Sequence, residues 1–413
     1  MKKIIVIGAG AAGMMAAAKA AENGAEVILL EKMKRVGKKM LITGKGRCNI
    51  TNTASVPELI KNMIGNGSFL NSAIRAFDNE DVVSFFNELG LVTKVERGGR
   101  VFPESDKAAD VVGTMMRQLH RLGVKIETEM AVKRILVEDG RVVGIESMSG
   151  ALYKSDAVIL AAGGSSYPGT GSSGDGYAMA EAIGHTIVPL RPSLIPLETE
   201  EEWVRETQGL SLRNVRVTAL ADGKKIGEEF GEMLFSHFGV TGPIILSLSR
   251  VVADALSQNQ FVELIINLKP ALTPETLDKR IQRDFEKYIR KQLKNSLHDL
   301  LPSKLIQPVM DLSYLDGEKE IHQITKEERL RLLETLQHLR LTVTKTRPLA
   351  EAIVTAGGVE TKQISPKTME SKVVKGLYFA GEVIDIDGYT GGFNLQAAFS
   401  TGAAAGQYAV WND

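Results

Sequence analysis

The sequence predicts an α/β fold in which a Rossmann-type domain, built from both ends of the chain, is interrupted by an inserted region. Three observations lead to this prediction. A strand, a glycine-rich turn and a helix follow one another at the N-terminus, and a second glycine-rich loop leads into a helix near the C-terminus. Between them lie strand-like and then helical patterns of another kind. At 413 residues the chain has room for two or three domains.

The composition is that of an ordinary globular protein, with 44% hydrophobic and 24% charged residues. Lys plus Arg and Asp plus Glu both total 50, so the chain as a whole has no electrostatic attraction to nucleic acid or to an anionic membrane. The single cysteine, Cys48, excludes an intramolecular disulfide and a multi-cysteine metal site. Beyond the N-terminal run, no stretch of eighteen apolar residues occurs, so we expect a cytoplasmic protein without a membrane span. No metal-ligand spacing of histidine or cysteine appears, so we expect no metal site.

The first motif is a complete strand, turn, helix and strand unit. An apolar strand at 3–7 runs into Gly8, Gly10 and Gly13, which interrupt what otherwise looks like a signal peptide. The glycines allow a tight turn and let backbone N–H groups approach a pyrophosphate at the start of the helix. Glu31 ends the second strand eighteen residues after Gly13, where it can accept hydrogen bonds from a ribose. The unit predicts a dinucleotide site but does not distinguish NAD from FAD.

A basic, glycine-rich loop follows at 32–52. Its lysines could neutralise a diphosphate, although for any single lysine a solvated loop is the more frequent role. Between Gly44 and Asn49, glycines, a cation, a thiol and an amide lie close together, which suits a backbone that approaches a flat ring. Arg47 and Asn49 could donate to flavin carbonyls or to a substrate anion. We expect Cys48 to be structural, or a bystander near the ring, because no second cysteine accompanies it.

The middle of the chain contains a second literal match to the glycine pattern, at 169–174. It lies eight residues beyond the preceding strand, and no second acidic strand end follows, so we do not predict a second dinucleotide site. The small residues of 161–164 instead suit a chain that passes close under a bound dinucleotide. A helix is expected at 177–183. Because no second dinucleotide site is predicted, a donor such as NAD(P)H, if the cofactor is a flavin, would visit it only transiently.

The closing segment reads as a strand at 376–383, a glycine-rich loop and a helix from Leu395 to about Val410. The start of that helix would present free N–H groups and a positive dipole end to the electron-rich edge of a flavin. Asp387, in the loop, is the expected partner of a ribityl hydroxyl.

The inserted region has strand-like runs at 215–220 and 261–268, typical of a small antiparallel barrel, and a helical pattern at 273–341. Its first helix is basic and could follow an RNA backbone, although a solvated face is the more frequent meaning of such a charge run. His237 could donate a proton to a carbon opposite flavin N5, and a satisfied turn histidine is an equal alternative.

Taken together, these segments resemble the BaiN and aminoacetone-oxidase-like family of FAD-dependent oxidoreductases, also called YhiN-type flavoproteins. The matching stretches are GAGAAG at 8–13, GKGRCNITN at 44–52, GRVFP at 99–103, AAGGSSYPGTGSSGDGY at 161–177, LFSHFGVTGP at 234–243, TAGGV at 355–359 and GLYFAGEVIDIDGYTGGFNLQAAFSTG at 376–402. The resemblance implies a glutathione-reductase-like FAD domain with an inserted β-barrel-like domain and a helical subdomain inside the insertion. The expected boundaries are 1–190 and 342–413 for the FAD domain with the returning barrel edge, 191–272 for the barrel and 273–341 for the helices.

The resemblance also implies positions for the cofactor. The residues expected to face the adenosine and diphosphate are Gly8, Gly10, Gly13, Glu31, Lys32 and Lys38, with Val132 bracketing the adenine. Those expected along the ribityl chain and ring are Asn49, Gly381, Glu382, Asp387, Asn394 and Leu395. The same segments add Ala12, Gly44, Gly46, Arg47, Cys48, Ala162, Gly163, Gly392 and Phe393 to the predicted cofactor-binding set.

We therefore expect an FAD-dependent oxidoreductase that transfers hydride between flavin N5 and an electron-poor C=C or C=N bond, with NAD(P)H as a possible donor. Arg47, His237 and Tyr389 are the candidate catalytic contacts. Family members resemble enzymes proposed for steroid-like enones, for small amino ketones and for uridine reduction in ribosomal RNA. Two alternatives stay open: reduction of a ribosomal RNA uridine, with Arg283, Lys287 and Arg290 reading the RNA, and a flavin-dependent interaction module without turnover. The sequence names neither the small-molecule substrate nor the oligomeric state.

Overall fold

The computed structural model describes residues 1–412, and the chain divides into two compact units. The first unit joins Met1–Ser193 to the segment that begins at Leu349, and the second unit is Leu194–Pro348. Each unit has its own hydrophobic core. Within residues 1–412, no helix is both long enough and apolar enough to cross a membrane.

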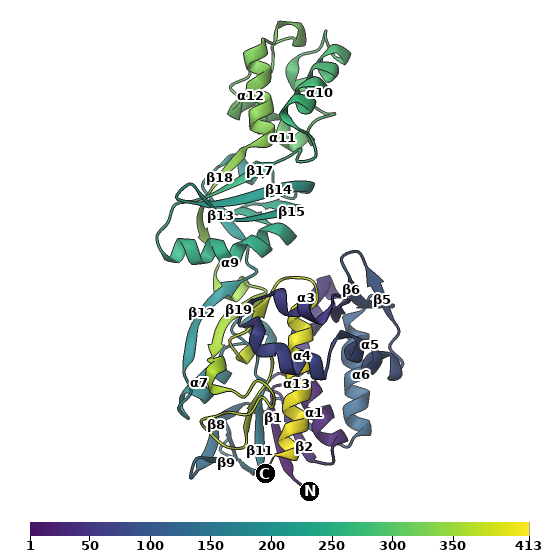
Figure 1. Ribbon diagram of the computed structural model, residues 1–413, viewed down its shortest axis with the longest axis vertical. Helices are drawn as coiled ribbons and strands as arrows, with labels where there is room; N and C mark the ends of the chain where they lie inside the picture. The colour runs from purple at the N-terminus through teal and green to yellow at the C-terminus, as the bar shows by residue number, and fades with distance from the viewer. Residues whose placement is uncertain (413) are drawn as a thin grey trace. The chain divides into compact units, whose positions relative to one another are not determined.

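A five-stranded parallel sheet forms the centre of the first unit (Figure 1). Its strands, in spatial order, are β20 (Leu377–Phe379), β11 (Ala157–Leu160), β1 (Lys3–Ile7), β2 (Glu26–Leu30) and β7 (Lys125–Glu127). The inner strands are continuous apolar runs, as expected where both faces of a parallel sheet are covered. Because β20 comes from the last part of the chain and pairs with β11, the sheet is completed only when both ends of the chain meet.

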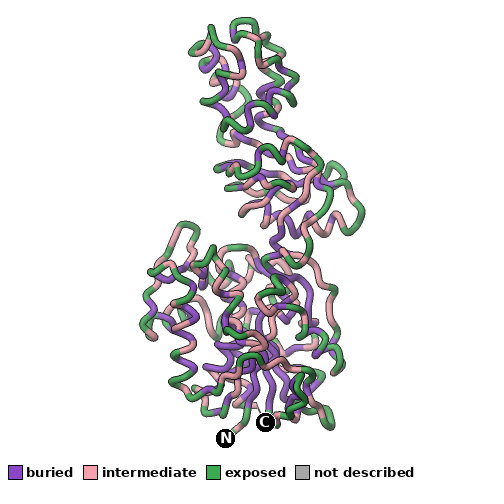
Figure 2. Tube along the Cα trace, turned by 180° about the vertical axis from the view of Figure 1, so that it is seen from behind, coloured by how far each residue is buried: buried purple, intermediate pink, exposed green. Residues whose placement is uncertain are grey.

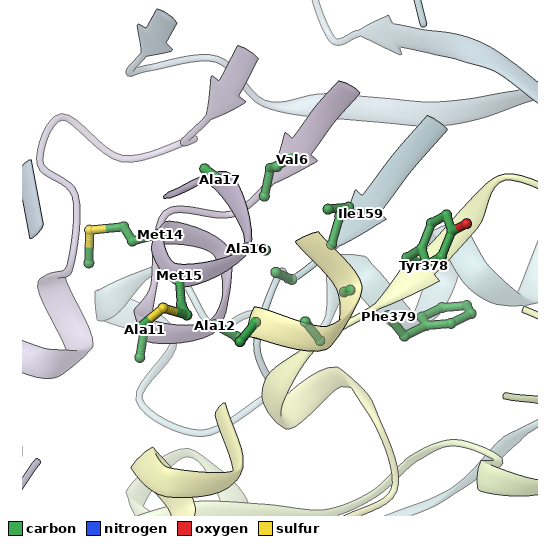
Figure 3. Packing of buried hydrophobic residues seen from close by; sticks show 14 of the residues in the cluster. Val6, Ala11, Ala12, Met14, Met15, Ala16, Ala17, Ile159, Tyr378 and Phe379 are labelled. Atoms are coloured by element: carbon green, nitrogen blue, oxygen red, sulfur yellow. The ribbon is translucent and has the colours of Figure 1, made fainter. Parts of the chain in front are cut away.

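Two helices rich in small residues, α1 (Ala11–Glu22) and α13 (Phe393–Trp411), touch through their backbones. A Cβ atom on Gly402 would lie 2.4 Å from the Ala12 carbonyl oxygen, and one on Gly406 would lie 2.2 Å from that of Ala16. Figure 3 shows Ala12 and Ala16 beside the yellow ribbon of the C-terminal segment, with Ile159 and Phe379 of the sheet nearby. Only glycine fits at these two positions of α13.

The pairing also fixes the direction and stagger of these helices. Ala12 lies against Gly402 and Ala16 against Gly406, so α1 and α13 run in the same direction. α13 begins nine residues before Gly402, whereas α1 begins one residue before Ala12. At the rise of an α-helix, the start of α13 therefore lies about 12 Å beyond the start of α1.

The other elements of the first unit surround this core. Its remaining helices are α2 (Lys38–Ile42), α3 (Val56–Lys61), α4 (Asn71–Ala76), α5 (Asn79–Glu88), α6 (Ala108–Arg121) and α7 (Asp175–Glu181). Its smaller sheets are β3 (Thr51–Asn52) with β6 (Arg100–Pro103) and β5 (Thr93–Glu96); β8 (Val132–Glu138) with β9 (Arg141–Ser147) and β10 (Leu152–Lys154); β12 (Ile187–Ser193) with β19 (Val354–Val359); and β4 (Met63–Gly65) with β21 (Asp387–Gly388). Short 3₁₀ turns lie at Thr43–Gly46, Gly67–Leu70, Pro168–Thr170, Leu349–Glu351, Thr361–Gln363 and Gly381–Val383.

The second unit is a closed six-stranded barrel that carries helices. Around the barrel the strands are β13 (Leu197–Thr199), β16 (Gly239–Thr241), β15 (Lys224–Ser236), β14 (Ser211–Ala221), β17 (Val262–Asn267) and β18 (Leu339–Thr346). The helices are α8 (Trp203–Glu206), α9 (Pro243–Ser257), α10 (Pro274–Lys287), α11 (Ser303–Leu312) and α12 (Lys326–Gln337), with 3₁₀ turns at Leu293–Asn295 and Ile321–Gln323. Inward-facing residues alternate along the strands, as Val262, Leu264 and Ile266 of β17 show. Figure 2 shows the buried positions of this unit along the trace.

The predicted fold class, a Rossmann-type α/β domain with an inserted barrel and helices, is confirmed. The finer boundaries of 1–190, 191–272, 273–341 and 342–413 stay predictions. Some element ends differ: α13 begins at Phe393 rather than Leu395, and α12 ends at Gln337, because the chain has returned to the barrel by Leu339. The strands on either side of Glu129, Lys125–Glu127 and Val132–Glu138, belong to different sheets, because the chain turns at Glu129 with a φ of 57°.

The contact between α1 and α13 predicts opposite effects for two helical glycines. Gly406→Ala should lower the free energy of unfolding by about 1–3 kcal/mol, because its Cβ would overlap the Ala16 backbone. Gly113→Ala in α6, whose Cβ would meet only the end of the Arg117 side chain at 3.4 Å, should be neutral or stabilising by up to about 1 kcal/mol. Denaturant unfolding of the two variants measures both effects, and equal effects would contradict the packing.

Candidate functional site

The glycine turn between β1 and α1 is shaped by packing at two positions and open at the third. Gly8 has a φ of 100°, and a Cβ there would lie 2.5 Å from the Ala161 carbonyl oxygen; a Cβ on Gly13 would lie 1.8 Å from the Gly8 oxygen. Gly10 caps α1, and a Cβ on it would meet nothing within 4 Å. The turn therefore presents its open side at Gly10, at the start of the helix.

Both of the packed helices begin with free N–H groups that no side chain satisfies. Neither Gly10, which precedes α1, nor Gly392, which precedes α13, caps its helix with a side chain, and neither first turn contains an acidic residue. The first four N–H groups of a helix have no partner within the helix, and they carry the positive end of its dipole. Two such ends, about 12 Å apart along parallel helices, suit one extended ligand with negative or electron-rich groups at both places.

Glu31 holds the first turn rather than projecting freely. Its carboxylate accepts hydrogen bonds from the backbone N–H of Ala9 and of Met33, both at 2.9 Å. The N–H of Met130 donates to the Glu31 carbonyl oxygen, which brings the segment before Val132 alongside the end of β2. Each carboxylate oxygen keeps a second lone pair for a hydroxyl donor.

The predicted basic residues after Glu31 divide into paired and free side chains. Lys32 binds Ser173 and Asp175, at the start of α7, and so bridges two loops. Lys38 is exposed at the first position of α2. The bridge explains where the second glycine pattern lies: a Cβ on Gly171 would be 3.0 Å from the Met33 side chain, so the 169–174 loop covers the end of β2. This loop is thus a neighbour of the first motif.

The small residues expected under the dinucleotide do pack closely. Ala162 and Gly163 follow β11. Gly163 has a φ of 76°, and a Cβ on it would lie 3.0 Å from the Ser172 hydroxyl oxygen. A Cβ on Gly381 would lie 2.7 Å from that of Ala12, which is itself buried against α13. These contacts bring the last strand of the sheet against the first helix.

Glu382 is the centre of a network that the sequence did not reveal. One carboxylate oxygen accepts from the Lys39 ammonium at 2.6 Å, and the other accepts from the Thr355 N–H at 2.8 Å and the Ser166 hydroxyl at 3.2 Å. The Lys39 and Glu382 side chains are only 23% and 19% exposed. The carboxylate thereby joins α2, the loop after β11 and β19. No feature of the sequence indicates that Lys39, rather than the adjacent Lys38, pairs with Glu382. Thr355, in contrast, belongs to the TAGGV stretch at 355–359, one of the stretches on which the family resemblance rests.

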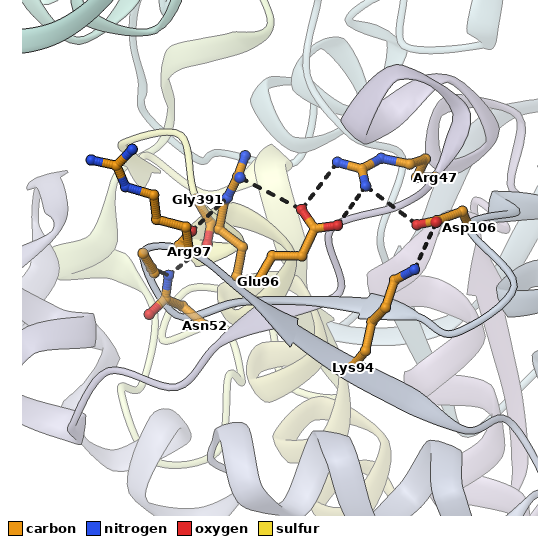
Figure 4. Close-up of polar contacts among 9 residues, drawn as sticks. Arg47, Asn52, Lys94, Glu96, Arg97, Asp106 and Gly391 are labelled. Carbon is orange, nitrogen blue, oxygen red and sulfur yellow. Dashed lines mark hydrogen bonds and ion pairs between the residues drawn. The ribbon is translucent and has the colours of Figure 1, made fainter. Parts of the chain in front are cut away.

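Arg47 already binds acidic side chains of the β5–β6 hairpin and of the segment that follows it (Figure 4). Its guanidinium donates to both oxygens of Glu96, at 2.7 and 3.3 Å, and to Asp106 at 3.3 Å, and it lies over the Phe102 ring. The hydrogen bond to Glu96 raises the pKa of Arg47, and the same bond lowers the pKa of Glu96. Neither acid was identified from the sequence, because both lie some fifty residues away.

The loop around Arg47 has an unusual backbone and one buried thiol. Gly44 and Gly46 have positive φ values of 56° and 83°, and Cys48 follows at 63°. Cys48 is fully buried, and burial raises the pKa of its thiol to about 12. Its expected structural role is consistent with that environment.

Polar groups gather at the start of α13. The Oδ1 atom of Asn49 is buried and has no hydrogen-bond partner among the described residues. A Cβ on Gly392 would lie 2.3 Å from the Thr51 carbonyl oxygen, so the loop that contains Asn49 passes directly against the helix start. Phe393 is buried and Leu395 partly buried there.

The loop before α13 is held by its own side chains. The Asn394 side chain bonds the backbone of Gly388 in both directions, at 2.8 and 2.7 Å, and the Tyr389 carbonyl oxygen at 3.2 Å. Asp387 is buried and accepts from the Ser193 hydroxyl at 2.7 Å. The Tyr389 N–H donates to the Asn62 carbonyl oxygen. These contacts fix the loop's path past the helix start.

His237 lies in the second unit, at the exposed turn between β15 and β16. Its ring packs edge-on against Phe238, with 5.0 Å between the centroids. The other predicted cofactor-binding and catalytic residues all lie in the first unit.

The residues of the first unit fit FAD. An open glycine turn and uncapped helix start suit a diphosphate, and Glu31 retains acceptor capacity for a ribose. About 12 Å further along, a second uncapped helix start lies against the loop that carries the buried, unpartnered amide oxygen of Asn49. This donor and acceptor set matches a ligand with a nucleotide at one end and a polar, electron-rich ring at the other.

Comparison with known proteins identifies the family. Residues 2–408 match the HI0933-like protein Rossmann domain. A 3-dehydro-bile acid delta(4,6)-reductase of Clostridium scindens is 33% identical over 413 residues, which cover 99% of both chains. A ribosomal RNA dihydrouridine synthase of Haemophilus influenzae is 32% identical over 404 residues, 97% of this chain and 96% of that protein.

Among solved structures, a 3-ketosteroid delta1-dehydrogenase from Sterolibacterium denitrificans aligns over 100% of both chains with a TM-score of 0.56. At 14% sequence identity, this likeness shows a shared fold and nothing more.

The pairing of Lys39 with Glu382 predicts a compensating pair of substitutions. Lys39→Met should lower the free energy of unfolding of the FAD-free protein by about 1–3 kcal/mol, because it leaves a mostly buried carboxylate without its cation. Adding Glu382→Gln should restore part of the loss, since a neutral amide needs no counter-charge. Lys38→Met, at an exposed neighbour, is the matched control and should change stability by less than about 0.5 kcal/mol. Additive effects in the double variant would contradict the pairing.

The raised pKa of Cys48 predicts a thiol that is silent in the folded protein. Because its pKa is about 12, the thiol stays protonated from neutral pH to about pH 10, and it is also inaccessible. An aromatic disulfide reagent at pH 8 should therefore react with the thiol only after denaturant is added. Rapid reaction with the native protein would show that the 44–49 loop opens.

Proposed function

Because the chain belongs to the HI0933-like Rossmann family of FAD-dependent oxidoreductases, we propose that it reduces a carbon–carbon double bond conjugated to a carbonyl group. The observation that carries this proposal is the pair of relatives, each related along nearly the whole chain but named for different substrates. A 3-oxo-4-ene steroid and a uracil ring differ in size and polarity. Both contain a C=C bond that is made electron-poor by conjugation to a carbonyl, and that bond accepts hydride.

We infer which residues would hold FAD. The start of α1, with Gly8, Gly10 and Gly13, would bind the diphosphate, with Glu31, Lys32, Lys38 and Val132 around the adenosine. The start of α13, together with Gly44, Asn49, Glu382 and Asp387, would lie along the ribityl chain and ring. Bound FAD supplies hydride transfer at N5. The chain's contribution is to orient the cofactor and, through the positive end of α13, to favour negative charge beside it.

The proton donor is part of the proposal. Addition of hydride to a conjugated C=C bond leaves negative charge that must be protonated at the neighbouring carbon. Tyr389, at the loop before α13, and His237, in the second unit, are the proposed donors. Arg47 is proposed to hold the 44–49 loop in place, since Glu96 and Asp106 already occupy its guanidinium.

Reduction of uridine in ribosomal RNA is the second candidate, and the name of one relative favours it. The basic helix α10 gives it limited support, because nearby acids neutralise part of its charge. Lys287 pairs with Asp299 at 2.7 Å, and Arg280 lies 3.7 Å from Asp284. A small-molecule acceptor therefore remains the first candidate, and NAD(P)H is the proposed donor. The cytoplasm is the proposed compartment, because it suits a single cysteine that is not in a disulfide.

A reoxidation experiment tests the proposal. FAD-loaded protein reduced anaerobically by NADPH should be reoxidised by a 3-oxo-4-ene bile acid, and not by its saturated counterpart, as followed by return of the flavin absorbance. Mass spectrometry of ribosomal RNA from cells with and without the gene forms the second arm, because a loss of dihydrouridine would favour the RNA candidate. No reoxidation by the bile acid together with an unchanged dihydrouridine content would contradict the proposed reaction and favour a module without turnover.

A further inference from the structure

The turn between β5 and β6 carries two arginines on a rigid backbone. Residues 97–99 form the turn, and Gly98 and Gly99 have consecutive positive φ values of 79° and 72°. A Cβ on Gly99 would lie 2.7 Å from the side-chain oxygens of Asn52 and Thr53, and the Thr53 N–H donates to the Gly99 carbonyl oxygen at 2.8 Å. The turn is therefore packed against the 51–53 segment on one side.

Asn52 fixes this turn to the start of α13. Its amide nitrogen donates to the Gly98 carbonyl oxygen at 3.0 Å and to the Gly391 carbonyl oxygen at 2.9 Å (Figure 4). Gly391 directly precedes Gly392, the residue that caps α13. One amide group thus places the arginine-bearing turn beside the helix start where the flavin end of FAD is proposed to lie.

The charges at this turn do not balance. Arg47, Lys94, Arg97 and Arg100 bring four positive charges, whereas Glu96 and Asp106, which pair with Arg47, Lys94 and Arg100, bring two negative charges. The carboxylate of Glu104, near Lys94, adds a third. Glu96 binds Arg47, and Asp106 binds Lys94. These hydrogen bonds lower the pKa of both carboxyl groups, so both acids stay ionised. One positive charge therefore remains in excess among these groups.

The excess resides on Arg97 and Arg100. Arg100 reaches Glu96 only at 3.5 Å, and its side chain is 43% exposed. The exposed Arg97 guanidinium makes no hydrogen bond or ion pair with any residue from 1 to 412, and Figure 4 shows it directed away from Glu96 and Asp106. Both guanidiniums therefore have free N–H donors on a backbone that is already ordered.

We propose that Arg97 and Arg100 bind an oxyanion, a carboxylate or a phosphate, of the reactant that meets the flavin. Guanidinium groups donate paired, charge-assisted hydrogen bonds that match both kinds of oxyanion. The rigid turn adds geometric specificity, because binding need not order the backbone. The inference rests on the proposed function, since it places the flavin at the start of α13, and it deepens that function by assigning the substrate an anionic group.

An anion titration of the FAD-loaded protein tests the inference. Inorganic phosphate and acetate are the two probes, and the readout is the difference absorbance of the bound flavin. We expect a saturable change in the unmodified protein and about tenfold weaker binding, or none, in the Arg97→Gln, Arg100→Gln double variant. Arg121→Gln, at the exposed end of α6, removes the same charge elsewhere and should bind the probes as the unmodified protein does.

The two probes separate the possible sources of the group. Tighter binding of phosphate indicates a phosphorylated reactant, and tighter binding of acetate indicates a carboxylate-bearing one. If the double variant loses stability, Arg97→Gln alone carries the test, because this exposed side chain makes no hydrogen bond or ion pair with residues 1–412 whose loss could unfold the protein. Unchanged binding in the arginine variants, or no saturable change in the unmodified protein, would overturn the inference. Failure of the proposed function is distinguishable, since it would show as protein that takes up no FAD or a reduced flavin that no acceptor reoxidises.

Discussion

The direct backbone contact between α1 and α13 is the constraint on which the first unit depends. Because residues 402 and 406 are glycines, the backbone of the last helix lies directly against the backbone of the first at Ala12 and Ala16. Their parallel direction and stagger then follow from which residues touch. A cofactor site that needs two positive helix ends at a set separation can be built in this way from segments almost four hundred residues apart in the sequence.

Around this contact, backbone geometry does more to shape the site than side chains do. The carbonyl oxygens of Gly8, Thr51 and Ala161 lie where side chains would be if Gly13, Gly392 and Gly8 were any other residue. Such close approaches leave N–H groups and small surfaces facing the ligand space. The side chains nearby mostly hold these backbones: Glu31 braces the first turn, Asn394 the last loop, and Asn52 the hairpin turn.

Several charged residues at the site already form ion pairs with one another. Lys32 with Asp175, Lys39 with Glu382 and Arg47 with Glu96 each satisfy a charge that would otherwise be costly to shield partly from water. A charged residue in a glycine-rich loop therefore does not indicate a ligand contact by its position alone. The cations left without acids, Arg97 above all, become visible only when these pairs are known.

The sequence by itself determined the Rossmann-type fold, the first dinucleotide-binding unit, the closing helix and the barrel-like insertion, because each depends on local periodicity and on glycine spacing within some thirty residues. Only the tertiary structure decided that Lys39 rather than Lys38 pairs with Glu382, that Arg47 is engaged by the β5–β6 hairpin, and that the 169–174 loop covers the end of β2. The physical reason is the same in each case. Hydrogen bonds and ion pairs act over a few ångströms in space, and nothing in the order of residues reports which distant side chains the packing of α1 against α13 brings within that distance.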